Sequence, residues 1–117
     1  MIVKWSLRAE RVWYKTLQQI NDEFGYRTAV TFRKETSLAV RQIRKFPKSG
    51  PPEDLLASAD KEYRGLAFGT YNKMIYYIAE AEGEIHIDDI WDTRREPKNQ
   101  AEGTLNDQQE GPSQIDK

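Results

Sequence analysis

The sequence has no cysteine and only one histidine among its 117 residues. Without cysteine the chain has no disulfides, no thiolate nucleophile and no cysteine-ligated metal. His86 stands between Ile85 and Ile87 in an apolar stretch, and no second ligand follows it at a spacing typical of metal sites. We therefore interpret His86 as a residue of a sheet, and we expect neither a metal centre nor a cofactor.

Long hydrophobic runs are also missing. The longest stretch without a charged residue, 65–72, has eight residues, whereas a membrane-spanning helix needs about 20. Near the start, Lys4, Arg8, Glu10 and Arg11 leave no room for the apolar region of a signal peptide. These absences predict one small cytoplasmic domain without a membrane partner.

The charge is unevenly distributed along the chain. Residues 1–98 contain 17 Lys and Arg against 15 Asp and Glu, a net charge of +2, whereas residues 99–117 contain one Lys and four acidic residues, a net charge of −3. Residues 99–117 also have no aromatic side chain and only two large aliphatic ones, Leu105 and Ile115. Such a segment buries too little apolar surface to offset the entropy of ordering it. The composition predicts a domain over 1–98 and a disordered tail over 99–117.

The first part of the chain predicts a short strand and a helix. Residues 2–5 are mostly apolar and suit an edge strand, and Ser6 can cap the helix that follows. Apolar residues then recur at helical spacing from about residue 7 to residue 24, where Gly25 is well placed to end the helix. They are Ala9, Val12, Trp13, Leu17, Ile20 and Phe24.

A second helix is predicted to begin near Arg27 or Thr28 and to end at Phe46, because Pro47 cannot continue it. The connection to the first helix is so short that the two should pack as an antiparallel hairpin. The exposed side of this second helix is basic, and we interpret it as a solvated face.

Residues 63–97 organise the rest of the chain. Three apolar or alternating runs, 63–68, 71–79 and 84–91, are separated by short turns that contain glycine. This pattern is typical of strands joined in antiparallel hairpins. The whole order is β-α-α-β-β-β, which predicts an α+β fold with a helical hairpin packed on one face of a small, mostly antiparallel sheet.

Four basic residues accompany these strands: Arg64, Lys73, Arg94 and Arg95. In a meander their strands are neighbours, so the side chains are able to converge on one face and bind phosphate or carboxylate. The alternative is that they form structural ion pairs with nearby carboxylates, namely Glu62, Glu84 or Asp92. From the sequence alone we hold both interpretations open.

Asp88 and Asp89 follow each other in the last predicted strand. Successive residues of a strand point to opposite faces, so this pair is not expected to act as an acid–base dyad. Arg94 or Arg95 is the expected partner of these carboxylates.

The motifs along the chain resemble those of the RelE/ParE superfamily of bacterial toxins from type II toxin–antitoxin modules. The likeness rests on an arginine that enters the meander in 64–66, on the second strand 69–77, and on the final stretch 90–97 with its Arg-Arg-Glu-Pro sequence. Phe46-Pro47 followed by Gly50 matches the family's Phe-Pro-x-x-Gly. Together these motifs cover residues 1–98.

The resemblance implies a small toxin that inhibits growth, as in plasmid stabilisation, unless a cognate antitoxin binds it. ParE-like members inhibit DNA gyrase, and RelE-like members cut mRNA in the ribosomal A site. If this chain is a nuclease, Arg64, Lys73, Arg94 and Arg95 are the residues that correspond to catalytic groups that stabilise phosphate. The antitoxin is expected to contact the outside of the hairpin or the sheet, with acidic residues near this basic set.

Two departures from the family pattern distinguish the mechanisms. Nuclease members often carry a tyrosine or histidine soon after the final arginine, whereas the last tyrosine here is Tyr77. They also often have several lysines before the arginine at position 64, where this chain offers only Lys61. These departures place the gyrase inhibitor slightly ahead of the nuclease, and a relative that has lost its toxicity is the third alternative.

Overall fold

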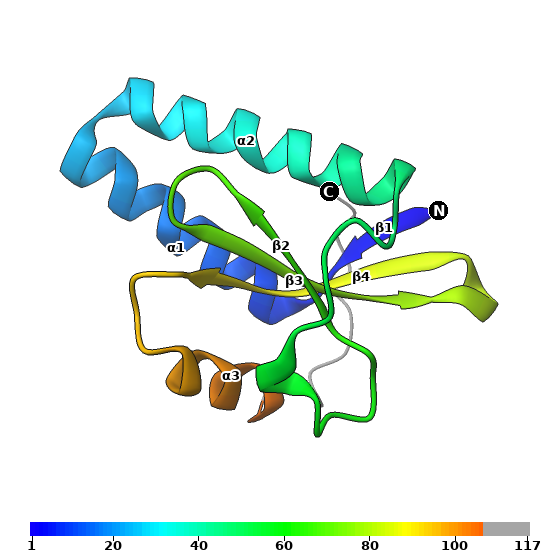
Figure 1. Cartoon of the computed structure of the whole chain (residues 1–117). Coiled ribbons are helices and arrows are strands. Elements are labelled where there is room, and N and C mark those ends of the chain that lie inside the picture. Colours follow the sequence, from blue (N-terminus) through cyan, green and yellow to red (C-terminus); the bar gives the residue numbers. More distant parts are fainter. Residues whose placement is uncertain (107–117) are drawn as a thin grey trace.

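A four-stranded sheet forms the centre of the structure, a computed structural model that describes residues 1–106 (Figure 1). Its strands are β1 (Ile2–Trp5), β2 (Arg64–Phe68), β3 (Asn72–Ala79) and β4 (Glu84–Asp92), in the order β1-β4-β3-β2. The strand β1 runs parallel to β4 at one edge, and the other pairs are antiparallel. The predicted α+β fold and the edge position of β1 are confirmed.

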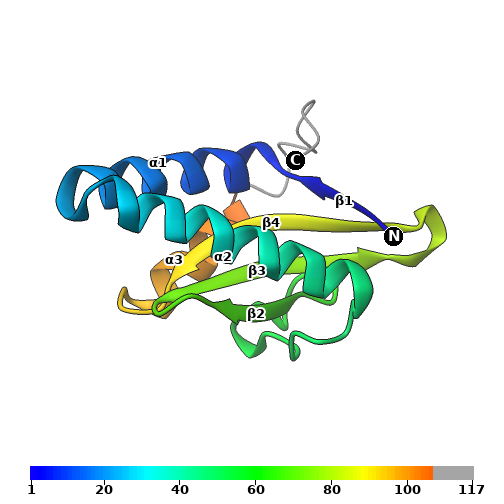
Figure 2. The ribbon, with the colours of Figure 1, turned by 90° about the horizontal axis from the view of Figure 1, so that it is seen from above.

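The helices α1 (Leu7–Phe24) and α2 (Tyr26–Lys45) form a hairpin over one face of the sheet (Figures 1 and 2). The hydroxyl of Ser6 caps α1 by accepting a hydrogen bond from the Ala9 N–H at 3.0 Å. Gly25 alone links the helices, with φ at 92°, a conformation that favours glycine. The hairpin was predicted correctly, although α2 begins one or two residues earlier than expected.

The main core lies between this hairpin and the sheet. Alternate residues of β3, among them Met74 and Tyr76, meet Ile87 of β4 and the helix residues Phe32 and Ile43, and all five are buried. The burial of these apolar and aromatic side chains is the chief source of stability for this packing.

A smaller core lies on the opposite face of the sheet. It is covered by the 3-10 turn η1 (Asp54–Leu56) and by a third helix, α3 (Pro97–Asn106) (Figure 1). The cluster contains Leu56, Tyr63, Ile75, Trp91 and Ala101. The domain therefore has three layers: hairpin, sheet, and α3 with η1.

The helix α3 corrects the predicted tail. Residues 99–106 were expected to be disordered, but they belong to α3, where Ala101 and Thr104 are buried. Composition was misleading here because α3 is held partly by hydrogen bonds that Gln100 and Thr104 form with β4, and both residues count as polar in any tally of hydrophobicity. The remaining part of the predicted tail, 107–117, lies outside the described residues.

An irregularity in β4 changes the arrangement of Asp88 and Asp89. Ile75 pairs with Asp89 and Tyr76 pairs with Ile87, so Asp88 has no partner across the ladder. Both carboxylates then bond to groups on the α3 side of the sheet, Asp88 to the Tyr63 hydroxyl at 2.6 Å and Asp89 to Thr104. The predicted opposite orientation is wrong because the bulge breaks the alternation.

None of the helices within residues 1–106 is both long and apolar enough to cross a membrane.

Candidate functional site

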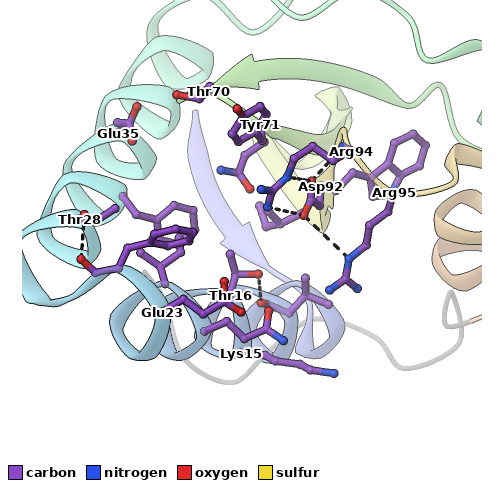
Figure 3. Close-up of a pocket in the computed structure, with 18 of the residues that line it drawn as sticks. Lys15, Thr16, Glu23, Thr28, Glu35, Thr70, Tyr71, Asp92, Arg94 and Arg95 are labelled. Carbon is purple, nitrogen blue, oxygen red and sulfur yellow. Dashed lines mark hydrogen bonds and ion pairs between the residues drawn. The ribbon is translucent and has the colours of Figure 1, made fainter.

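A groove of about 660 Å³ opens where β4 ends, between the hairpin and the turn that joins β2 to β3 (Figure 3). Its walls include Lys15 and Glu23 from α1, Glu35 from α2, Tyr71 from the turn, and the segment that follows β4. That segment carries Arg94 and Arg95 into the groove, and we call the site the arginine groove.

Arg94 is held firmly in this groove. Its Nε donates to Asp92 Oδ1 at 3.1 Å and its Nη2 donates to Asp92 Oδ2 at 3.0 Å, while its backbone N–H also donates to Oδ1. The guanidinium lies 4.4 Å from the centre of the Tyr71 ring, within the range of a cation–π contact. The hydrogen bonds from Arg94 lower the pKa of the Asp92 carboxyl below its ordinary value, so Asp92 stays ionised and keeps Arg94 in place at neutral pH.

Arg95 is held more loosely. Its Nε lies 3.9 Å from Asp92 Oδ2, and 64% of its side chain is exposed. In Figure 3 its guanidinium points toward α1 rather than back over Asp92. Most of its N–H donors are therefore available to a carboxylate or phosphate, which an arginine fork binds through two parallel hydrogen bonds.

The four basic residues predicted from the sequence do not share one site. Arg64 lies opposite Tyr76, on the hairpin side of the sheet, and donates from Nη1 to the Gly50 carbonyl at 2.8 Å. Lys73 lies on the α3 side, where its Nζ is 2.9 Å from Glu53 Oε2 and 5.6 Å from the Trp91 ring centre. The structure brings together only Arg94 and Arg95.

The expected ion pair between Asp88 or Asp89 and the arginine pair is not present. Asp89 accepts a hydrogen bond from Arg8 at 2.8 Å, and both arginines turn to Asp92 instead. The sequence signal for Asp92 was its position two residues before Arg94 at the end of a strand. Nothing local to the sequence indicates the bond between Arg8 and Asp89, because 81 positions separate them.

Three residues that make cation–π or hydrogen-bond contacts at the groove were not among the predicted site residues. They are Tyr71 beneath Arg94, Asp92 between the two arginines, and Gln100, which reaches the groove from α3. Tyr71 belongs to the motif 69–77, but the chain gives no local sign that its ring meets Arg94 across the turn.

A second hollow, the hairpin furrow, runs along the outside of α1 and α2. Two adjoining parts, about 570 and 710 Å³ in volume, share Arg33, Ser37 and Arg41. Trp5 forms part of its lining, and the Nε1 atom of this buried indole has no hydrogen-bond partner among the described residues. Leu38, which also lines it, is 60% exposed. The furrow therefore combines one unpaired buried donor with exposed apolar area, as docking surfaces do.

The comparisons with known proteins bear on the fold. No family model matches the sequence, and no curated protein sequence matches it. Among solved structures, the chain is similar to one in a structure described as "Chromosomal ParDE TA system from P. aeruginosa", with a TM-score of 0.63 and 15% identity. The alignment covers 79% of this chain and 95% of the other. At this identity the likeness establishes the fold, and it confirms the resemblance in fold that the motifs predicted.

Proposed function

We propose that this protein is the toxin of a toxin–antitoxin module and that it inhibits growth by binding its target in the manner of ParE, with DNA gyrase as that target. The similarity in fold to a chain of a ParDE structure supports the module. The separation of the four basic residues supports binding rather than cleavage: Arg64 and Lys73 lie on opposite faces of the sheet, and each is already paired.

Cleavage of RNA sets stricter requirements. A nuclease that activates a ribose 2′-hydroxyl needs a base and an acid within hydrogen-bond reach of one phosphate, with cations around it. Here Arg94 and Arg95 are the only two of the four that lie together, and the nearest carboxylate, Asp92, is engaged by both. A pair of arginines on an exposed turn is better suited to grip a carboxylate or phosphate of a partner.

The decisive experiment is controlled expression in a bacterial host with two double variants. Arg94→Ala with Arg95→Ala removes the exposed fork, whereas Arg27→Ala with Lys98→Ala removes the same charge at exposed positions outside the groove. We expect the wild type and the control to stop growth and the Arg94/Arg95 variant to permit it, with the circular dichroism of all three unchanged. Full toxicity of the Arg94/Arg95 variant would rule out the groove as the target site.

The cellular process that fails first after expression of the protein identifies the target. Loss of DNA supercoiling and induction of the DNA damage response, with messages intact, is expected for a gyrase inhibitor. Rapid cleavage of mRNA within translated frames would replace this proposal with the RelE-like alternative. Unchanged growth on expression of the wild type would show a relative without toxicity.

The antitoxin partner is proposed to dock in the hairpin furrow. Arg33, Arg41 and Arg44 line it and form no ion pair within residues 1–106, so an acidic, amphipathic segment would meet both the charge and the apolar floor. Co-purification with the product of the neighbouring gene tests this. Arg41→Glu with Arg44→Glu should abolish co-purification, whereas Arg27→Glu with Lys98→Glu should retain it; equal loss in both variants would argue against the furrow.

A further inference from the structure

Gln100 makes an unusual pair of contacts with the main chain of β4. Its side-chain Oε1 accepts a hydrogen bond from the Asp92 N–H at 2.7 Å, and its Nε2 donates to the Asp92 carbonyl at 2.9 Å. Both backbone groups of one residue are thus satisfied by one side chain. A carboxamide carries the same donor and acceptor as a peptide group, so Gln100 pairs with Asp92 as a residue of a neighbouring strand would.

The topology explains why this position is open to a side chain. The edge strand β1 pairs with β4 only from Glu84 to Ile87, after which the chain turns into α1. On its other side, β4 remains paired with β3 as far as Asp92. The outer edge of β4 at Asp92 therefore has no strand beside it, and without Gln100 its N–H and C=O would be left at a partly buried position.

Asp92 connects Gln100 to the arginine groove. The backbone of Asp92 is fixed by Gln100, and its carboxylate receives the three hydrogen bonds from Arg94 described above. We propose that Gln100 is a positioning residue, which holds Asp92 so that Arg94 stays against Tyr71 in the groove. The biological consequence of this positioning rests on the proposed function, because it requires that the arginine groove contacts the target.

The experiment uses isotope-labelled full-length protein and two NMR signals, the Asp92 amide and the Nε–Hε group of Arg94. Gln100→Met keeps the length of the side chain and removes both hydrogen bonds. We expect hydrogen exchange at the Asp92 amide to accelerate about tenfold or more, the effect of losing two bonds of ordinary strength. We also expect the Arg94 signal to shift and broaden, because its acceptor is no longer fixed.

Two further variants make the outcome specific. Glu102→Met changes an exposed residue of the same helix and should leave both signals unchanged. Gln100→Glu keeps the acceptor for the Asp92 N–H but loses the donor to its carbonyl, so it should restore part of the amide protection and part of the Arg94 signal. It also serves as the test if Gln100→Met does not fold.

The possible results separate three conclusions. An unchanged Arg94 signal, with faster exchange at Asp92, would show that Gln100 only stabilises the strand end and would overturn the proposal. If both signals respond, the toxicity of Gln100→Met should fall toward that of the Arg94/Arg95 variant, and full toxicity would overturn the link to function. If the wild type is not toxic at all, the proposed function fails, while the two NMR signals still decide the role of Gln100.

Discussion

The Nε atom of Arg8 donates a hydrogen bond to Asp89 Oδ2 at 2.8 Å and so joins the first turn of α1 to the last strand of the sheet. The same carboxylate accepts from Thr104 of α3 and from the indole N–H of Trp91. Asp89 is 1% exposed, and burial raises the pKa of its carboxyl, while Thr104 and Arg8 oppose that rise. The buried Asp89 carboxylate therefore connects all three layers of the domain through hydrogen bonds.

Asp89→Asn should destabilise the fold by about 1–3 kcal/mol, because the new NH₂ group would face donors and leave at least one of them unsatisfied. Urea denaturation followed by circular dichroism measures the change. Asp22→Asn, at an exposed position of α1, is the control and should stay within about 0.5 kcal/mol of the wild type. Equal effects of the two substitutions would show that the Asp89 cluster contributes nothing particular.

Gly50 should not tolerate a side chain. A Cβ atom there would lie 2.9 Å from the hydroxyl oxygen of Tyr76, and 3.0 Å from both the Tyr76 ring carbon Cε1 and the backbone carbon of Gly65. The Tyr76 hydroxyl donates to the Pro47 carbonyl at 2.7 Å and accepts from the Gly50 N–H at 3.0 Å. Gly50→Ala should therefore cost about 1–3 kcal/mol of stability, as overpacking does.

A double-mutant cycle with Tyr76→Phe isolates the cause of this effect. Removing the hydroxyl removes the closest of the three contacts, so Gly50→Ala should cost less in the Tyr76→Phe background than in the wild type. Strictly additive effects of the two substitutions would show that the Gly65 backbone and the Tyr76 ring, and not the Tyr76 hydroxyl, exclude the methyl group.

Removing α3 should destabilise the domain. A chain that ends at residue 96 loses the burial of Ala101 and the hydrogen bonds of Gln100 and Thr104, and it uncovers Trp91. We expect a loss of about 2–4 kcal/mol relative to a chain that ends at residue 106 and keeps α3. Thermal unfolding of the two chains measures the difference. Identical melting temperatures would return the domain boundary to residue 98.

The domain should lose stability in alkali. Burial, followed by the negative charge of Asp88, raises the pKa of Tyr77 from 10.0 to about 12. Because the folded pKa exceeds the unfolded one, the unfolded chain releases its proton first. The contribution of protonated Tyr77 to the free energy of unfolding is complete below pH 10 and is lost progressively as the pH rises toward 12. Burial also raises the pKa of Tyr63 and Tyr76, so the measurement is the difference in tyrosinate absorbance between the wild type and Tyr77→Phe. This difference should titrate well above pH 10; a Tyr77 that ionises near pH 10 would contradict the arrangement.

The sequence predicted the structure well wherever the regular spacing of apolar residues determined it. Helical spacing, together with Ser6, Gly25 and Pro47, predicted the bounds of α1 as observed and those of α2 within two residues. The strand runs and their glycine turns predicted the meander, and the motifs predicted the resemblance in fold. These features depend on neighbours along the chain, which a sequence displays directly.

The site was less predictable because its contacts connect distant segments. Arg64 and Lys73 occupy neighbouring strands, but Lys73 pairs with Ala67, an odd number of residues from Arg64, so the two side chains lie on opposite faces. No local pattern reveals this register. The bulge at Asp88 likewise redirected two carboxylates. The polar residues of α3 form hydrogen bonds with the edge of β4. Because they are polar, the composition of this helix resembled that of a disordered tail.

By itself, then, the sequence determined the order and type of the elements from residue 2 to residue 92, the hairpin and meander, and the arginine pair that ends β4. Only the tertiary structure decided that Arg94 and Arg95 stand apart from Arg64 and Lys73, that Arg8 meets Asp89, and that Gln100 completes the edge of β4. The physical reason is the range of the forces involved. Periodicity and capping act between residues a few positions apart, whereas buried polar groups find their partners only after the layers have packed.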